Sequence, residues 1–108
     1  MKSTFLNRTR RNREEIIASI LDTSRYGTSK TRIMYVSFLN FKQLQKYLIY
    51  MLEAKLLDLD PKAGKFHTTS KGLEFLKYFE DVAAVENSVI EKRRVLSKML
   101  TDKDAQIC

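Results

Sequence analysis

Apolar residues recur at helical spacing after a polar stretch at the beginning of the sequence. The first such set shares one face of an α-helix and consists of Ile16, Ile17, Ile20 and Leu21. Asn12 precedes this set, and Glu15 follows Asn12 by three positions, a spacing at which the two residues can cap a helix reciprocally. We therefore predict a first helix over about residues 13–24.

A second, shorter helix is expected next. Thr28 or Ser29 can cap it with a side-chain oxygen, and Ile33 and Met34 would then face inward. The pattern ends near Val36, so we predict only a short helix here.

The third helical pattern begins after a turn at residues 37–39. Asn40 can cap this helix while the Gln43 side chain reaches back, and we predict that the helix spans about residues 41–54. A helix with one apolar stripe packs that side on a core and leaves the other side in solvent. The apolar stripe consists of Phe41, Leu44, Leu48, Met51 and Leu52.

Polar residues occupy the other side of the third helix. Projection at about 100° per residue places Lys42 and Lys46 near the side opposite the stripe. The residues along the two edges of this side are Gln43 and Tyr50 on one and Gln45 and Ile49 on the other. An apolar Ile49 at this edge has no explanation in the sequence.

Leucine and aspartate alternate after the third helix. The alternating residues are Leu56 and Leu57, Asp58, Leu59 and Asp60. Residues 61–64 contain proline and glycine, as turns do, and residues 65–68 can form a returning strand. We predict a β-hairpin with a basic tip that carries Lys62 and Lys65.

The last pattern is a helix of unusual length. Thr69 or Ser70 can cap it, and from Gly72 to about Leu100 there is neither proline nor a further glycine. At about 1.5 Å per residue the helix would be roughly 45 Å long, which is more than a domain of this size can cover. A seam with steps of four and three, typical of a coiled coil, predicts a homodimer. The seam consists of Phe75, Phe79, Val82, Glu86, Val89, Arg93, Leu96 and Leu100.

The charge along this helix indicates the direction of pairing. Residues 71–91 carry two lysines against five acids, whereas residues 92–104 carry five basic residues against two acids. A parallel pair would set Glu86 against Glu86 and Arg93 against Arg93 in a partly dry seam, which is unfavourable. We therefore predict an antiparallel coil, in which Glu86 lies about one turn from the second copy's Arg93.

Three helices, a hairpin and a further helix in this order are typical of a winged helix-turn-helix domain. We predict a mainly α chain with a small β-hairpin wing and a long C-terminal coiled-coil helix. Its parts are a basic N-terminal arm at 1–12, a winged helix-turn-helix domain at 13–70, a dimerisation helix at 71–101 and a frayed tail at 102–108.

Two segments carry a family resemblance. They are T-R-I-M-Y-V-S-F-L-N-F-K-Q-L-Q-K-Y-L-I-Y-M-L at 31–52 and F-H-T-T-S-K-G-L-E-F-L at 66–76, and their most specific pieces are I-M-Y, Q-x-x-x-Y-L and T-x-K-G. Over about residues 12–85 the chain resembles the small archaeal winged-helix DNA-binding proteins first known from Sulfolobus chromatin. The resemblance implies a winged-helix fold, double-stranded DNA as the partner, and dimerisation through an antiparallel coiled coil of the last helix.

Net charge is divided unevenly along the 108 residues. The chain carries +7, and its first 50 residues hold ten Lys or Arg against three Asp or Glu, whereas residues 51–108 hold ten of each sign. All of the excess positive charge therefore lies in the arm and the first three predicted helices, where a polyanion would bind.

The candidate DNA contacts have basic or hydrogen-bonding side chains in the arm, the helix-turn-helix or the wing. In such a motif the third helix enters the major groove, where Lys can donate to guanine and Gln can pair with adenine, while Ser and a helix N-terminus suit phosphate. An arginine-rich arm suits phosphates or a narrow minor groove. The alternative is that these residues are ordinary solvated side chains. The candidates are Arg8, Arg10, Arg11, Arg13, Ser37, Asn40, Lys42, Gln43, Gln45, Lys46, Lys62 and Lys65.

Composition argues against several other classes. With 44% hydrophobic and 31% charged residues, the chain is typical of a folded globular protein. No apolar stretch approaches the roughly 20 residues of a membrane span, and no signal peptide is evident, so we expect a cytoplasmic, nucleoid-associated protein. The single cysteine, Cys108, cannot form an intrachain disulfide or a site of several thiolates.

Two rival functions are weighed against DNA binding. An enzyme is not expected, because there is one histidine, no glycine-rich phosphate loop and no nucleophile beside a base. No cofactor or metal is expected, since His67 would need further ligands. A protein-interaction module using Tyr47, Ile49 and Tyr50 is the stronger rival. Among DNA-binding roles, the sequence leaves a gene regulator and an architectural protein open.

Overall fold

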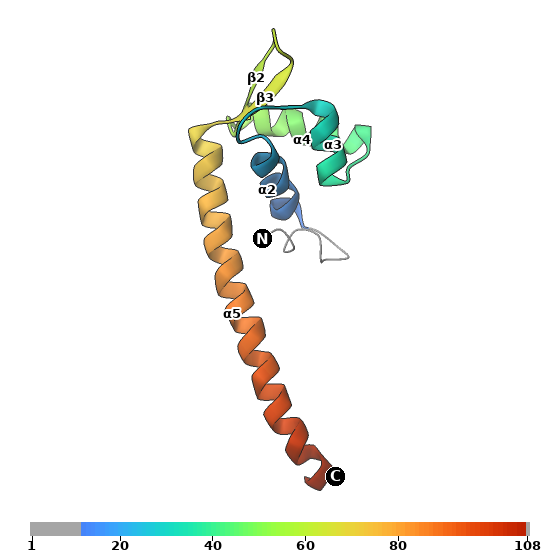
Figure 1. Cartoon of the computed structure of the whole chain (residues 1–108), viewed down its shortest axis with the longest axis vertical. Coiled ribbons are helices and arrows are strands. Elements are labelled where there is room, and N and C mark those ends of the chain that lie inside the picture. Colours follow the sequence, from blue (N-terminus) through green and yellow to red (C-terminus); the bar gives the residue numbers. More distant parts are fainter. Residues whose placement is uncertain (1–11, 108) are drawn as a thin grey trace. The chain divides into compact units, whose positions relative to one another are not determined.

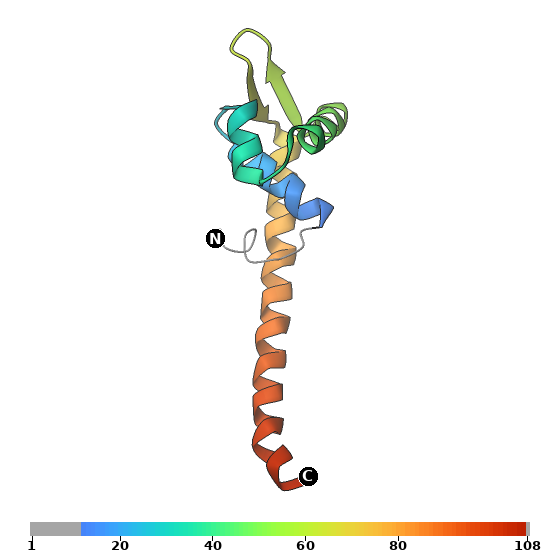
Figure 2. The same cartoon turned by 90° about the vertical axis from the view of Figure 1, so that its right-hand side faces the viewer.

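The computed structural model describes the backbone of residues 12–107 and the side chains of residues 12–101. Contacts divide the chain into two units, the first ending at Lys77 and the second beginning at Tyr78. The predicted fold class, mainly helical with a small β-sheet and a long C-terminal helix, is confirmed (Figure 1, Figure 2). The elements are α2 (Arg13–Thr23), β1 (Thr28–Ser29), α3 (Lys30–Ser37), α4 (Phe41–Glu53), β2 (Leu57–Asp60), β3 (Lys65–Thr68) and α5 (Ser70–Ile107).

Reciprocal capping begins both α2 and α4. In α2, the Asn12 Oδ1 accepts from the Glu15 backbone N–H at 2.8 Å, and the Glu15 Oε1 accepts from the Asn12 N–H at 3.0 Å. Asn40 and Gln43 repeat this arrangement in α4 at 2.8 and 3.1 Å. Each pair satisfies N–H groups that the first turn of a helix leaves without partners. The predicted beginnings of these two helices are confirmed.

The core of the first unit gathers side chains from α2, α3, α4, β2 and the first turns of α5. Burial of each such side chain contributes roughly 1.5–3 kcal/mol relative to exposure. Because Leu76 is among these residues, the beginning of α5 is part of the domain. The largest fully buried apolar residues are Ile20, Leu21, Ile33, Leu44, Met51, Leu57 and Leu76.

The buried face of α4 differs from the predicted stripe at one residue. Four of the five stripe residues are buried or half-buried, but Phe41 is 60% exposed. The Phe41 ring instead lies under the ammonium group of Lys30, whose Nζ is 4.8 Å from the ring centre. A cation over the ring face stabilises an aromatic side chain that the core does not cover. The prediction that Phe41 faces the core is therefore wrong.

The predicted hairpin is confirmed, and it carries a third strand that the sequence did not reveal. β2 and β3 pair antiparallel, from Leu57 opposite Thr68 to Asp60 opposite Lys65. β1 pairs with the other side of β3, so that the sheet order is β1-β3-β2. With only two residues, β1 is too short to show a strand period in the sequence.

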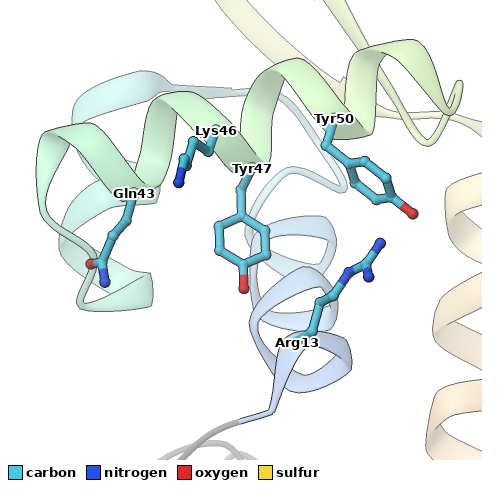
Figure 3. A pocket seen from close by; sticks show the side chains of 5 residues that line it. All are labelled: Arg13, Gln43, Lys46, Tyr47 and Tyr50. Carbon is cyan, nitrogen blue, oxygen red and sulfur yellow. The ribbon is translucent and has the colours of Figure 1, made fainter.

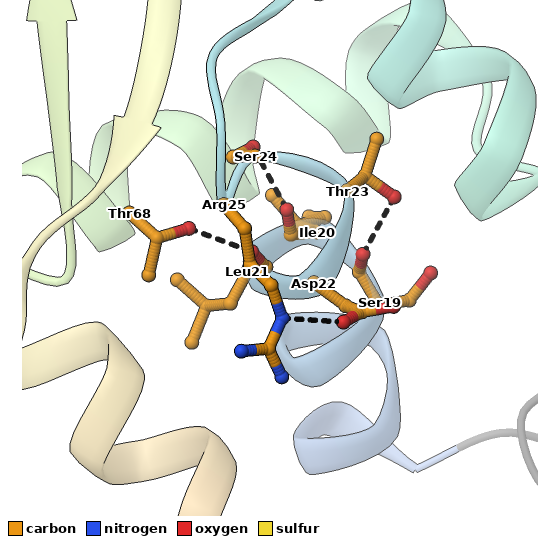
Figure 4. A network of polar contacts seen from close by, with 8 residues as sticks. All are labelled: Ser19, Ile20, Leu21, Asp22, Thr23, Ser24, Arg25 and Thr68. Carbon is orange, nitrogen blue, oxygen red and sulfur yellow. Dashed lines mark hydrogen bonds and ion pairs between the residues drawn. The ribbon is translucent and has the colours of Figure 1, made fainter. Parts of the chain in front are cut away.

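Hydrogen bonds join the end of α2 to the wing (Figure 4). Thr68 on β3 donates its hydroxyl to the Leu21 carbonyl at 2.6 Å and its backbone N–H to the Ser24 carbonyl at 3.0 Å. The Ser24 hydroxyl donates to the Ile20 carbonyl at 2.8 Å. These bonds supply partners to carbonyls at the helix end, where intrahelical partners run out, and the two bonds from Thr68 hold β3 against the end of α2.

The cap of α5 ties this helix to the hairpin. The Thr69 hydroxyl accepts from the Gly72 N–H at 3.0 Å and donates to the Lys55 carbonyl at 2.7 Å, and the Thr69 backbone N–H donates to the Leu56 carbonyl at 3.0 Å. Of the two predicted caps, Thr69 is therefore the one used.

α5 extends beyond its predicted end near Leu100 and continues to Ile107. The backbone of 102–107, within the segment predicted as a frayed tail, is helical. These residues include neither proline nor glycine, so no local signal ends the helix earlier. Cys108 lies outside the described residues.

Gly72 marks a close approach between α5 and the hairpin. A Cβ at this position would stand 2.5 Å from the Leu56 carbonyl oxygen and 2.6 Å from the Thr68 Cγ2. We expect Gly72→Ala to lower the free energy of unfolding by about 1–3 kcal/mol, because the packed elements must move apart. Urea denaturation measures this change. The control Glu74→Ala, exposed on the same helix, should change stability by less than about 0.5 kcal/mol. Equal stability of the two variants would contradict the close approach.

Candidate nucleic-acid interface

The outer side of α4 is basic and open to solvent. Lys42 and Lys46, which we call the crest, are both exposed, and neither forms an ion pair among residues 12–101. Leu44 and Leu48 face the core from the opposite side of the helix. Gln45, at the edge of the crest, is half-buried. The predicted orientation of α4 is confirmed, and the crest presents two positive charges without carboxylate partners in the described chain.

The capping residues of α4 already use part of their hydrogen-bonding capacity. The Asn40 Oδ1 accepts from the Gln43 N–H, and the Gln43 Oε1 accepts from the Asn40 N–H. Pairing with adenine needs both the oxygen and the NH₂ group of a side-chain amide. The cap engages the Gln43 Oε1, whereas its NH₂ group forms no hydrogen bond among the described residues and suits an acceptor such as a phosphate oxygen. The structure therefore favours a backbone contact over the adenine contact that the sequence suggested for Gln43.

Ser37 does not lie at the entry to α4. It belongs to α3, its side chain is fully buried, and its Oγ is 3.4 Å from the Ser19 Oγ on α2. A hydroxyl enclosed between two helices cannot reach a DNA phosphate. The prediction of Ser37 as a DNA contact is therefore wrong, because α3 extends past Val36 and carries Ser37 inside the domain.

Arg13 lies beside α4. It is the first residue of α2, and its guanidinium carbon is 4.7 Å from the centre of the Tyr50 ring. A cleft of about 360 Å³, which we call the α2–α4 cleft, opens here. Figure 3 shows its α4 side chains projecting on the side of the helix where Arg13 lies. The lining residues are Arg13, Gln43, Lys46, Tyr47 and Tyr50.

The wing tip carries two exposed lysines and a turn shaped by an aspartate. Lys62 and Lys65 are both exposed. The Asp60 Oδ1 accepts from the backbone N–H groups of Lys62 at 3.0 Å and Ala63 at 3.4 Å. An aspartate that bonds to the following backbone stabilises a tight turn. Asp60 therefore has a structural role at the tip, beside the predicted basic residues.

The arm is the part of the predicted interface for which no geometry is described. Arg8, Arg10 and Arg11 lie outside the described residues. Arg13 is the one arginine of this group with a described position, and it belongs to α2. Their contacts with DNA remain predictions.

α5 carries a second surface, made of apolar residues. In the second unit the seam residues Val82, Val89, Leu96 and Leu100 are between 46% and 63% exposed. The seam residues Glu86 and Arg93 are exposed as well. Phe75 and Phe79 are half-buried, and Phe75 lines a cleft with Arg13 and Tyr50 in the first unit. An apolar row of this length in water is typical of a surface that another protein surface covers.

Other kinds of site find little support in the described chain. Residues 12–101 contain no group of three or more His, Cys, Asp or Glu placed to hold a metal ion. None of the described helices combines the length and apolarity that crossing a membrane requires. His67 lies on β3 and packs against Gly27, where an added Cβ would stand 2.6 Å from its Nε2.

Sequence reasoning missed two aromatic features. Tyr47 and Tyr50 were assigned only to a rival function, because the pairing of Tyr50 with Arg13 requires the packing of α2 beside α4. The last turn of α3 and its C-cap residue also present aromatic rings, with Tyr35 81% and Phe38 69% exposed. Phe38 has a left-handed backbone with φ of 55°, a conformation uncommon for a bulky residue. The sequence spacing gave no signal for either feature.

Comparisons with known proteins agree with this geometry. The family model described as winged helix-turn-helix matches residues 10–87. The crystal structure of Sso10a-2, a DNA-binding protein from Sulfolobus solfataricus, has a similar fold, with a TM-score of 0.73 and 22% sequence identity. The similarity covers 83% of this chain and 97% of that chain. No curated protein matches. Because the family model covers well over half of the sequence, the chain belongs to the winged helix-turn-helix family.

Proposed function

We propose that the chain binds double-stranded DNA through α4 and is not an enzyme. The observation that carries this proposal is the crest, where Lys42 and Lys46 stand exposed on the outer side of the third helix without carboxylate partners among the described residues. In helix-turn-helix proteins this helix occupies the major groove. The similarity to Sso10a-2, a DNA-binding protein, supports the same function.

The arm and the wing would extend the contact along the DNA. Arg8, Arg10 and Arg11 bring three guanidinium groups within four residues, which suits phosphates and narrow minor grooves. Lys62 and Lys65 at the wing tip would meet the backbone of an adjacent groove. In this arrangement Asn40 and Gln45, which lie next to the crest on α4 and its cap, would make further polar contacts with the DNA.

We further propose a homodimer through an antiparallel coiled coil of α5. Support comes from the exposed apolar seam and from the reversal of charge along the helix, acidic over 71–91 and basic over 92–104. Antiparallel pairing brings Glu86 near Arg93 of the second copy and covers the apolar row. Two DNA-binding domains on one rigid coil would suit paired half-sites or the bridging of two duplexes.

A protein-interaction module is the alternative function. The exposed side chains of Ile49, Tyr35 and Phe38 favour it, because large apolar side chains left in water are available to bind another protein. The excess positive charge of the first half of the chain favours DNA instead.

DNA affinity should depend steeply on salt. If a dimer neutralises about six to eight phosphates, the association constant should fall by roughly three decades between about 50 and 200 mM salt. Fluorescence polarisation on a random duplex and on a duplex selected from a pool measures this. A selected duplex bound at least about a hundredfold tighter would indicate a regulator, and near-equal binding an architectural protein. No binding to either duplex at low salt would contradict the proposal and favour the interaction module.

Removing the crest charges should weaken binding by roughly a thousandfold or more at about 0.1 M salt, because the double variant Lys42→Gln with Lys46→Gln deletes four phosphate or base contacts per dimer. The matched control is Lys77→Gln with Lys98→Gln, which removes as much charge from exposed positions of α5 opposite the seam. The control should stay within about threefold of the wild type. If both double variants bind alike, α4 is not the contact.

A charge placed in the seam should separate the dimer. Val89 is 46% exposed, so Val89→Glu leaves the core of the chain intact while burying a carboxylate in the proposed interface. Light scattering should give 12.7 kDa for this variant and twice that mass for the wild type. The control Ala84→Glu adds the same charge to the opposite, exposed face and should remain dimeric. If both Val89→Glu and Ala84→Glu remain dimeric, the proposed seam is not the dimer interface.

The direction of the coil can be tested by exchanging charges. Glu86→Arg and Arg93→Glu should each weaken the dimer by several-fold or more, because each creates like charges across an antiparallel seam. The double variant should regain most of the wild-type dissociation constant in analytical ultracentrifugation. Failure of the double variant to recover would contradict the antiparallel arrangement.

A further inference from the structure

We propose that the α2–α4 cleft holds a phosphate of the DNA backbone, with Arg13 as its principal ligand. This inference rests on the proposed function and adds a second contact surface to α4. The crest would face the major groove. The edge of the same helix and the beginning of α2 would bind the backbone of the DNA strand that borders this groove.

The composition of the cleft lining favours an anion. Arg13 and Lys46 supply two positive charges, and Tyr47 supplies a hydroxyl donor. Gln43 contributes its NH₂ group, since its oxygen is engaged in the cap of α4. No carboxylate is among the described residues that line this cleft, whereas the neighbouring cleft, of about 370 Å³, includes Glu14. Arginine and lysine with polar hydrogen donors form the usual set of DNA phosphate contacts.

Tyr50 keeps the Arg13 guanidinium at the cleft. The distance of 4.7 Å between the guanidinium carbon and the ring centre is that of a cation–π contact. Arg13 forms no ion pair with any residue of the described part of the chain, so no carboxylate there competes with a phosphate for its N–H groups. A guanidinium resting on a ring keeps its edge available for hydrogen bonds, and Figure 3 shows the group below the Tyr50 ring, on the side of α4 to which Tyr47 also projects. Tyr50 is thus a positioning residue and Arg13 the ligand.

The cleft and the crest share Lys46, which lines the cleft and also belongs to the outer side of α4. A DNA strand that reaches Lys46 from the groove therefore passes the mouth of the cleft. The arm precedes Arg13 directly in the sequence, so a phosphate held here would also bring the beginning of α2 to the same DNA.

The salt dependence of DNA binding tests the cleft. Each phosphate contact contributes about 0.9 to the slope of log K against log salt, so Arg13→Gln should reduce the slope by about that amount per protomer. Its affinity should fall roughly five- to tenfold per protomer at about 0.1 M salt. The control Lys77→Gln removes the same charge from an exposed position outside the interface and should leave the slope unchanged. If the wild type binds DNA and Arg13→Gln has the same slope and affinity as Lys77→Gln, the cleft does not hold a phosphate, and the proposed function still stands. A wild type that binds no DNA overturns both.

Variants of Tyr50 separate a positioning role from a loss of folding. Tyr50→Phe keeps the ring and should bind DNA like the wild type, whereas Tyr50→Leu should lower affinity several-fold without a change in net charge. Thermal unfolding of both variants checks that the domain is intact, as expected for a side chain that is 44% exposed. If Tyr50→Phe lowers the DNA affinity as much as Tyr50→Leu does, the ring does not position Arg13.

A competition distinguishes the DNA backbone from a free phosphate as the occupant. At constant ionic strength, millimolar inorganic phosphate should change the DNA affinity of the wild type by less than about twofold, because a single anion lacks the neighbouring contacts of a strand. If inorganic phosphate competes with DNA for the wild type but not for Arg13→Gln, the assignment to the DNA backbone is overturned and the cleft binds free phosphate.

Discussion

The rotation of α4 about its own axis is set by the burial of Leu44, Leu48 and Met51, and the basic surface depends on that rotation. Side chains three and four positions apart share a helix face, so burying these three places the crest outward and the lining of the α2–α4 cleft along one edge. The capping pair at the beginning of α4 fixes where the helix begins. A shift of the helix by one residue would turn the crest by about 100° and remove both surfaces.

The two units of the chain present surfaces of different chemistry. In the first unit the exposed side of α4 is positively charged and lacks carboxylate partners among the described residues, which suits a polyanion. In the second unit α5 exposes an apolar seam with charged residues within it, which suits a second helix of the same kind. One helix, α5, belongs to both units, because Leu76 is buried in the core and Val82 is exposed.

Helices, hairpin and caps were predictable because their signals are local. The pairs of Asn12 with Glu15 and Asn40 with Gln43 show the spacing of reciprocal caps in the sequence. Features that depend on contacts between distant elements were not predictable, including β1, the burial of Ser37 against α2, and the stacking of Arg13 on Tyr50. Helical periodicity predicts the direction of a side chain but not which other element it contacts. The α2–α4 cleft could therefore be found only from the packing of α2 beside α4.

Mapping of backbone amide shifts by NMR, during titration of the ¹⁵N-labelled chain with a duplex, tests the central claim most directly. If α4 enters the major groove, the largest shifts should fall on residues 40–46 of α4 and its cap, with further shifts at Arg13 and around Lys62. Amide shifts respond to nearby charge, and contact with phosphates changes the electrostatic surroundings of these residues more than those of residues on the other exposed faces of the domain. Shifts confined to the end of α3 around Tyr35 and Phe38, or no shifts with the duplex in large excess, would contradict the account.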